Sequence, residues 1–205
     1  MNEGRLSDGY FDDLYDAHAD PWGFQDRWYE RRKRALTLAA LPLRRYRYAF
    51  EPGCSLGVLT AELAGRCDRI LATDVAPAAL AAAGERLADH EGVELRRWAL
   101  GQAWPPGPFD LVVLSEVLYY LDAELLGQVL IEATQALEPG GTLLAVHWRH
   151  PVSDYPLGGD RVHAEIARTT GLARIGRYAD DDVLVECYQR VPPQPQSVAA
   201  AEGLG

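Results

Sequence analysis

Residues 51–57 read EPGCSLG, and they directly follow the apolar residues Tyr48-Ala49-Phe50. An acidic residue and two glycines four positions apart, at the end of an expected strand, indicate a turn where the backbone approaches a small ligand. The glycine spacing and the surrounding elements narrow down which ligand this is.

The spacing argues against ligands with phosphate groups. From Gly53 the sequence reads G-C-S-L-G-V, so Ser55 and Val58 stand where the dinucleotide fingerprint G-x-G-x-x-G requires glycine. The sequence also lacks the phosphate-binding loop GxxxxGK[ST]. A nicotinamide cofactor and a nucleoside triphosphate are both disfavoured.

Outward from this turn, short apolar segments alternate with segments of helical spacing. Strands are expected at 48–51, 70–74, 93–98, 110–115 and 142–148, with a closing hairpin at 173–178 and 183–190, and helices at 25–41, 57–64, 77–90, 123–137 and 160–169. This alternation predicts an α/β fold with a mostly parallel sheet, helices on both faces and an antiparallel last strand. Ligands of such sheets bind at the carboxyl ends of the strands, where the strand order reverses. The turn at 51–57 follows the first strand and should lie there.

Composition restricts the class of protein. With 205 residues, 48% of them hydrophobic, the chain is long enough for one domain with a full core. No apolar run reaches the ~20 residues that cross a membrane, and the polar, acidic first residues do not read as a secretory signal. The net charge of −10 disfavours binding to nucleic acid or anionic lipid. We expect a cytoplasmic protein, whose oligomeric state the sequence leaves open.

The pattern E-x-G-x-x-x-G at Glu51–Gly57 resembles motif I of the class I S-adenosylmethionine (SAM) methyltransferases. Further matches are Thr73-Asp74 at the end of the second strand, where a carboxylate can accept hydrogen bonds from ribose hydroxyls, and the run LEPGGTLLAV at 137–146. The resemblance implies a single Rossmann-like domain with seven strands, SAM as cofactor and S-adenosyl-L-homocysteine (SAH) as product. It also implies an N-terminal helical lid at 1–42 and a methyltransferase domain at 43–191. The tail at 192–205 lacks bulky apolar residues that could anchor it and is expected to be disordered.

The sequence is also similar to a narrower family, the nodulation-protein-S-like (NodS-like) N-methyltransferases, which methylate the free amine of a deacetylated chitooligosaccharide. The matching segments are Pro21-Trp22, Tyr29–Lys33, Glu51–Thr60, Thr73–Val75 and the run SEVLYYL at Ser115–Leu121. This resemblance implies a small-molecule acceptor with an amine group, such as an amino sugar. Methylation of a hydroxyl group, and a SAM-binding domain without turnover, are the alternatives.

Candidate site residues follow from the resemblance and from the chemistry of methyl transfer, in which a neutral amine attacks the methyl carbon and a nearby base can take the proton or orient the N–H groups. For catalysis they are Glu116, Tyr120 and His147. For the cofactor they are Trp22, Arg31, Glu51, Gly53, Cys54, Ser55, Gly57, Asp74, Val75, Ala99, Leu100, Ser115 and Glu116. For the acceptor they are Tyr15, Tyr119, Trp148 and Arg149. In place of the Asp that many relatives carry after the third strand, this chain has Trp98-Ala99-Leu100.

Three other patterns have simpler explanations. His147, His150, Asp154 and His163 are irregularly spaced on a loop, so we expect no metal site. The basic run at 31–34, RRKR, is expected to be a solvated helix face and not an RNA-binding surface, because the chain as a whole is acidic. Cys54, Cys67 and Cys187 are scattered and are expected to be free, small buried thiols.

Overall fold

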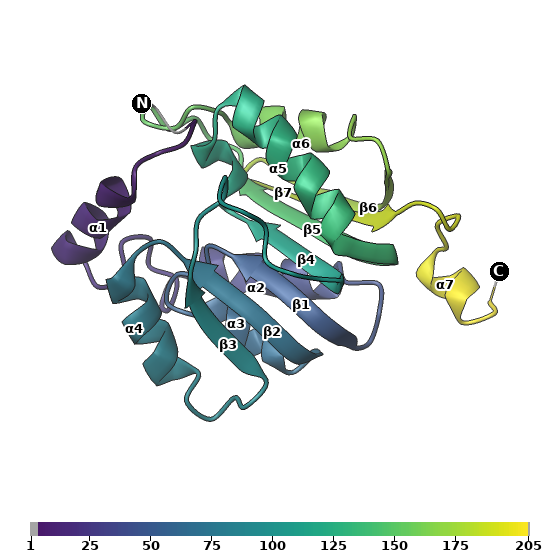
Figure 1. The fold of residues 1–205 in the computed structure, drawn as a ribbon, viewed down its shortest axis with the longest axis horizontal. Coiled ribbons are helices and arrows are strands. Elements are labelled where there is room, and N and C mark those ends of the chain that lie inside the picture. Colours follow the sequence, from purple (N-terminus) through teal and green to yellow (C-terminus); the bar gives the residue numbers. More distant parts are fainter. Residues whose placement is uncertain (1–3, 205) are drawn as a thin grey trace.

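The computed structural model describes residues 4–204, and a seven-stranded sheet forms its centre. The strands follow the order β3-β2-β1-β4-β5-β7-β6 (Figure 1). Their bounds are β1 Tyr46–Pro52, β2 Cys67–Asp74, β3 Val93–Arg97, β4 Phe109–Ser115, β5 Leu137–Trp148, β6 Leu172–Ala179 and β7 Val183–Arg190. The first five strands pair in parallel, whereas β7 runs antiparallel between β5 and β6. The strand order therefore reverses between β1 and β4, as the sequence predicts for this fold.

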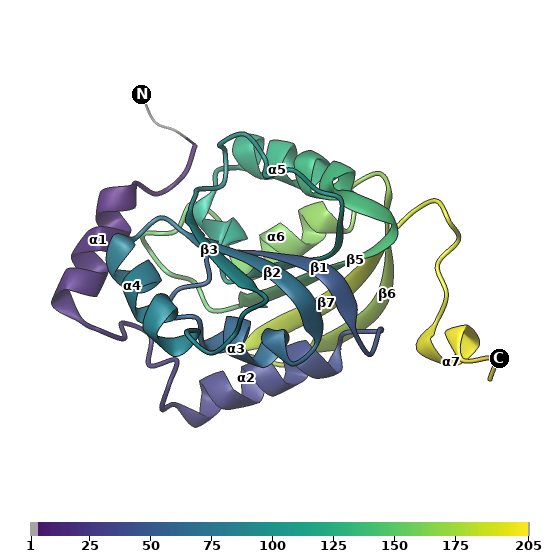
Figure 2. The ribbon, with the colours of Figure 1, turned by 60° about the horizontal axis from the view of Figure 1, so that its bottom comes forward.

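Helices cover both faces of the sheet (Figures 1 and 2). One face carries α2 (Trp28–Ala39), α3 (Val58–Ala64) and α4 (Pro77–Arg86), and the other carries α5 (Ala123–Ala136) and α6 (Gly159–Ile166). A short 3-10 helix, η1 (Leu118–Tyr120), follows β4, and α1 (Asp8–Ala17) lies beside α4. In both views the four-residue helix α7 (Val198–Ala201) lies apart from the sheet. No helix among residues 4–204 is long and apolar enough to cross a membrane.

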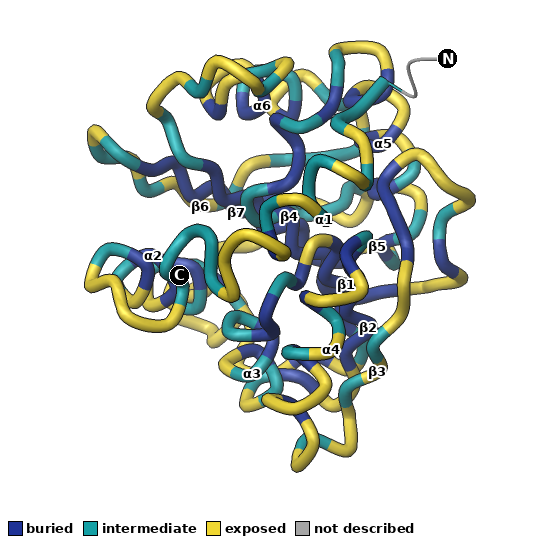
Figure 3. Tube along the Cα trace, turned by 90° about the vertical axis from the view of Figure 1, so that its left-hand side faces the viewer, coloured by how far each residue is buried: buried dark blue, intermediate teal, exposed yellow. Residues whose placement is uncertain are grey.

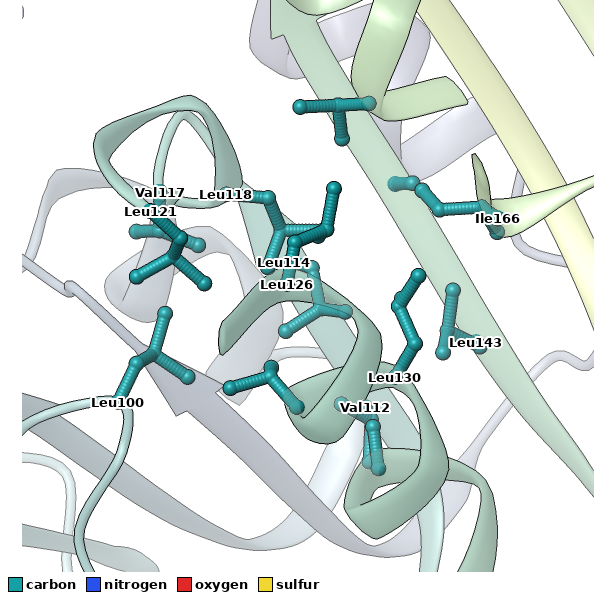
Figure 4. Close-up of a cluster of buried hydrophobic side chains, with 14 of the residues drawn as sticks. Leu100, Val112, Leu114, Val117, Leu118, Leu121, Leu126, Leu130, Leu143 and Ile166 are labelled. Atoms are coloured by element: carbon teal, nitrogen blue, oxygen red, sulfur yellow. The ribbon is translucent and has the colours of Figure 1, made fainter. Parts of the chain in front are cut away.

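Strand β4 divides the core into two layers. Its residues alternate, so that Val112 and Leu114 pack among the helices α5 and α6, while Leu111 and Val113 pack on the opposite face. Figure 4 shows the first layer, with Leu114 of β4 beside Leu126 of α5. Both faces of this strand are buried, which explains its continuous apolar run. In Figure 3 buried residues follow the inner strands and exposed ones gather in the loops.

The structure contains a helix, α1, ahead of residue 25, where the first helix is expected from the sequence. Helix α1 begins after Ser7, whose side chain accepts a hydrogen bond from the Tyr10 backbone N–H, the usual role of a serine at this position. Ahead of it, the chain pairs with the end of η1: the Leu6 N–H donates to the Tyr120 carbonyl at 3.0 Å. The N-terminal segment is thereby fixed next to the turn that follows β4.

The division into a lid, a domain and a disordered tail stays a prediction.

Leu114 tests the packing of the core. Leu114→Ala removes a fully buried side chain and leaves a cavity between β4 and α5, so we expect the free energy of unfolding to fall by about 3 kcal/mol. The control is Leu43→Ala, which truncates a side chain that is 45% exposed and should change stability by less than about 0.5 kcal/mol. Urea denaturation of both variants measures the difference, and equal losses would contradict the described core.

Candidate active site

A crevice of about 300 Å³ lies at the carboxyl ends of the strands, next to the reversal of strand order. Its walls come from α1, from α2, from the turn after β1, from the end of β2 and from the turn after β4. Figure 3 looks at the side of the molecule where α1 lies against this end of the sheet. The side chains that line it include carboxylates, basic groups and aromatic rings.

The turn after β1 has an unusual backbone conformation. Gly53, Ser55 and Gly57 all have positive φ angles, of 74°, 51° and 70°. At Gly53 a side chain is excluded, because a Cβ would lie 2.2 Å from Val117 Cγ1. The turn is held by Asp74 at the end of β2, whose carboxylate accepts the N–H groups of Ser55 at 2.8 Å and Ala76 at 3.0 Å. These hydrogen bonds and φ angles therefore fix the backbone of the turn at the wall of the crevice.

Glu51 lies beneath this turn. Its side chain is 2% exposed, and one carboxylate oxygen, Oε2, has no hydrogen-bond donor. Burial raises the pKa of Glu51 to about 7, and the neighbouring Asp74 carboxylate also raises it. A buried oxygen without a partner at the wall of a crevice is a ready acceptor for an N–H group of a ligand.

The turn after β4 presents a carboxylate. Glu116 is a non-glycine residue with a φ of 59°, a conformation that costs free energy and is frequent at functional sites. Its Oε1 lies 3.0 Å from Lys33 Nζ, and its Oε2 accepts hydrogen bonds from the Tyr119 hydroxyl and, at 3.1 Å, from the Trp148 N–H. Of the roughly four lone-pair positions of a carboxylate, about one is left for a ligand.

Helix α2 supplies a polar wall that the sequence analysis did not assign to the site. Lys33 is 6% exposed and lies 3.0 Å from both Glu30 and Glu116. Burial lowers the pKa of Lys33, but the carboxylates of Glu116 and Glu30 outweigh it, so its pKa is raised overall. Arg34 is also buried and pairs with Glu62. The prediction of a solvated basic face was wrong for these two residues.

A signal for this wall was present in the sequence. Glu30, Lys33, Arg34 and Thr37 stand at the spacing i, i+3, i+4, i+7, which places them on one face of a helix, and all four are buried. Lys33 is also the single lysine of the chain. A polar stripe with helical spacing indicates a face turned toward a polar site as readily as one turned toward water.

Aromatic rings form the rest of the wall near Glu116. Tyr119 stacks on Tyr155 with ring centroids 4.9 Å apart, and Tyr29 meets Trp148 edge to face at 5.1 Å. On the other side of the turn after β1, the hydroxyl of Tyr15 binds the Ser55 side chain. Rings of this kind exclude water and provide flat surfaces for a ligand with an apolar face.

Known proteins resemble this chain in sequence and in fold. A family model described as a methyltransferase domain matches residues 50–143. A crystal structure from Pseudomonas syringae, of a protein assigned to the methyltransferases, is 46% identical in sequence, with a TM-score of 0.71, and the match covers 80% of this chain and 100% of that one. This chain belongs to the class I SAM-dependent methyltransferases.

The methyltransferase is also similar to NodS proteins. The structure of the N-methyltransferase NodS from Bradyrhizobium japonicum WM9, in complex with SAH, matches 92% of this chain and 100% of that one with a TM-score of 0.81 and 25% identity. Nodulation protein S of Rhizobium tropici is 32% identical over 133 residues, which are 62% of this chain and 55% of that protein. The chain thus spans about half the length of the curated relatives it matches. These findings confirm the family and the fold expected from the sequence.

Most of the expected site residues of the methyltransferase line the crevice. They are Tyr15, Trp22, Glu51, Gly53, Cys54, Ser55, Asp74, Val75, Ala99, Leu100, Ser115, Glu116, Tyr119, Tyr120 and Trp148. Gly57 lies just behind the turn, where it precedes helix α3. Their roles toward a cofactor or an acceptor stay predictions. The three cysteines are free and buried, as expected.

Arg31 and Arg149 lie outside the crevice. Arg31 is exposed, and its guanidinium donates a hydrogen bond to the Asp26 carbonyl, because its position on α2 faces away from the crevice. The guanidinium of Arg149 forms two hydrogen bonds with the Asp160 carboxylate, at 2.8 and 3.0 Å. Neither side chain lines the crevice in this structure, and the contacts expected of Arg31 with the cofactor and of Arg149 with the acceptor stay predictions.

His147, the other candidate base, also lies away from the crevice. It is fully buried outside the crevice, where its Nε2 accepts a hydrogen bond from the Leu118 N–H at 3.3 Å, and its Nδ1 lies 3.1 Å from His163 Nε2. His163 continues the chain of hydrogen bonds to Glu186 at 2.8 Å. Both ring nitrogens are hydrogen-bonded within the protein, so His147 supports the turn after β4, and its expected role as a base stays a prediction. No group of three or more potential metal ligands is found within residues 4–204.

The burial of His147 predicts a pH effect on stability. Burial, followed by the charges of His163 and Lys33, lowers the pKa of His147 well below 6.5. As the pH falls below about 6.5, the unfolded chain therefore gains a proton here that the folded chain refuses, and the free energy of unfolding decreases. The raised pKa of Glu51 has the opposite effect, because the folded chain takes up a proton at Glu51 over the same pH range and its free energy of unfolding increases. The effect of His147 is therefore measured as the difference between the wild type and a His147 variant.

Urea denaturation of the wild type and of His147→Gln at pH 7.0 and 5.5 isolates this effect. Glu51 is present in both proteins, so its contribution cancels. The wild type should lose about 1 kcal/mol more than the variant on acidification. Equal losses in the two proteins would show that His147 is not held neutral in the folded state.

Proposed function

We propose that this chain transfers a methyl group from SAM to the nitrogen of a small polar acceptor, releasing SAH. The continuity of the crevice supports this proposal most strongly. One cavity joins the turn at Gly53 and Asp74 to the carboxylate of Glu116 and the ring of Tyr119. A cofactor bound at Gly53 and Asp74 and an acceptor bound at Glu116 and Tyr119 would therefore meet inside the same crevice.

The residues at the turn after β1 fit SAM. The unpartnered oxygen of Glu51 suits an ammonium group, and the Asp74 carboxylate, with two backbone N–H groups already bound, has about two lone-pair positions left for ribose hydroxyls. The adenine ring of SAM would find an apolar surface at Val75, Ala99 and Leu100. When bound, SAM would supply a methyl group attached to a positively charged sulfur.

The side chains near Glu116 suit an acceptor amine. The remaining lone-pair position of Glu116 can accept one N–H bond and so turn the nitrogen lone pair toward the centre of the crevice. Tyr119, Tyr120 and Trp148 keep water out. We propose the amine of an amino sugar, such as a deacetylated chitooligosaccharide, because aromatic walls beside carboxylates suit a sugar ring that carries an amine group.

Binding of SAH to Asp74 variants tests the cofactor site. Asp74→Asn removes the charge that accepts ribose hydroxyls and places N–H donors against the Ser55 N–H, so we expect SAH affinity to fall about 10- to 100-fold. Asp68→Asn, the same change at an exposed position of β2, should bind like the wild type. Calorimetry measures both, and unchanged affinity in Asp74→Asn would refute the assigned site.

Glu116→Gln tests the role of the carboxylate in methyl transfer. SAH binding should persist, while methylation of D-glucosamine and of deacetylated chitobiose, followed by mass spectrometry, should fall at least about tenfold because the amine loses its orienting acceptor. Glucose and cellobiose serve as hydroxyl-only controls. Methyl transfer to these controls would indicate O-methylation, and tight SAH binding without any methylated product would indicate a domain without turnover.

A further inference from the structure

Two buried polar atoms on the first turn of α2 have no partner. The hydroxyl of Tyr29 and the Oε2 oxygen of Glu30 are both inaccessible to solvent and lack a hydrogen bond. Glu30 is 5% exposed, and both residues line the crevice. Lys33 Nζ lies 3.0 Å from each Glu30 oxygen but is aligned for a hydrogen bond only with Oε1. Unsatisfied buried groups are costly, so their presence at a cavity wall points to a ligand that satisfies them.

The charges around these atoms do not balance. At this wall Lys33 contributes one positive charge, whereas Glu30 and Glu116, with which it pairs, contribute two negative charges; Arg34 is paired with Glu62, which does not line the crevice. One negative charge therefore remains uncompensated at a largely buried wall of the crevice. A ligand that brings a positive charge would remove this imbalance, whereas a neutral or negatively charged ligand would not.

The position of Lys33 shows what kind of group this wall accepts. Its ammonium lies between the carboxylates of Glu30 and Glu116 and faces the ring of Tyr29, 5.2 Å from the ring centroid. Carboxylates and an aromatic face are the partners that bind organic ammonium groups. Lys33 uses only part of them, because the Tyr29 hydroxyl has no hydrogen-bond partner and Oε2 of Glu30, although it lies 3.0 Å from Lys33 Nζ, accepts no hydrogen bond.

We propose that Tyr29, Glu30 and Glu116 form an ammonium subsite, which binds the acceptor as a protonated primary amine. Before methyl transfer the ammonium passes one proton to the Glu30 carboxylate, and the lone pair of the neutral amine that remains attacks the methyl carbon. The ammonium donates hydrogen bonds to Glu30 Oε2, to the Tyr29 hydroxyl and to the remaining lone pair of Glu116. The subsite selects amines over hydroxyl compounds by charge. This inference rests on the proposed function for its biological meaning, but the binding itself can be measured without turnover.

The test uses n-propylammonium chloride as the probe and n-propanol as its neutral counterpart. Each is titrated at pH 7 and constant ionic strength into the chain saturated with SAH, a thioether without the sulfonium charge, and saturation-transfer NMR reports binding. The wild type should bind the ammonium at least about tenfold more tightly than the alcohol, since hydrogen bonds to a charged group are the stronger ones.

Three variants locate the binding. Glu30→Gln should weaken propylammonium binding about 10-fold or more, and Tyr29→Phe about 3- to 10-fold. Tyr29→Phe removes a hydroxyl that has no partner in the free chain, so it should fold at least as stably as the wild type, which keeps the test valid should Glu30→Gln unfold. Tyr48→Phe makes the same change on β1, outside the crevice, and should bind like the wild type.

Several outcomes would overturn the proposal. They are equal binding of alcohol and ammonium, no saturable ammonium binding by the wild type, and undiminished binding in both Tyr29→Phe and Glu30→Gln. A loss of SAH affinity in Tyr29→Phe, measured by calorimetry, would instead assign these atoms to the cofactor. Failure of the proposed function is distinct, because it would show in the methylation assay or in SAH binding by the wild type, neither of which the propylammonium titration measures.

Discussion

The whole site depends on one backbone turn, which Asp74 holds after β1. The carboxylate at the end of β2 accepts the Ser55 N–H, while the N–H groups of Gly53 and Cys54 donate to the Thr73 carbonyl. The backbone can follow this path because Gly53 has no side chain to collide with Val117. Because Gly53 packs closely on Val117, the turn after β1 lies against the turn after β4. Two loops that are distant in the sequence thus form the floor of one crevice.

A buried polar network connects this floor to the N-terminal region. Lys33 joins α2 to Glu116, and Glu116 in turn holds Tyr119 and the end of β5. Buried ion pairs seldom add stability compared with apolar packing, because charges lose their hydration. Their concentration here, together with the positive φ of Glu116, indicates that this region is shaped by ligand binding at some cost in stability.

The fold could be predicted from the sequence because its signals are local. The apolar run Leu111–Leu114 marks a strand covered on both faces, and the glycines after β1 mark the turn, without reference to distant residues. Helix α1 lacks such a pattern, so its bounds within the helical lid expected at 1–42 were not predicted, although Ser7 gives a cap signal. Helix α4 ends at Arg86, earlier than expected, since the next residue, Leu87, packs behind Gly57.

The site was predicted less completely, for a physical reason. Residues on the motif turn reached the crevice because the motif itself determines their geometry. The roles of Lys33 and His147 depend instead on partners far away in the sequence: Glu116 lies 83 positions after Lys33, and His163 lies 16 positions after His147. A basic run looks solvated and a histidine at a strand end looks accessible until the fold supplies those partners.

A crystal structure of the chain with SAH tests the central claim most directly. The account predicts the ribose hydroxyls on the Asp74 carboxylate, and the sulfur facing the side of the crevice that holds Glu116 and Tyr119. A crevice that takes up a dinucleotide instead, with its pyrophosphate against the turn between Gly53 and Gly57, would contradict it.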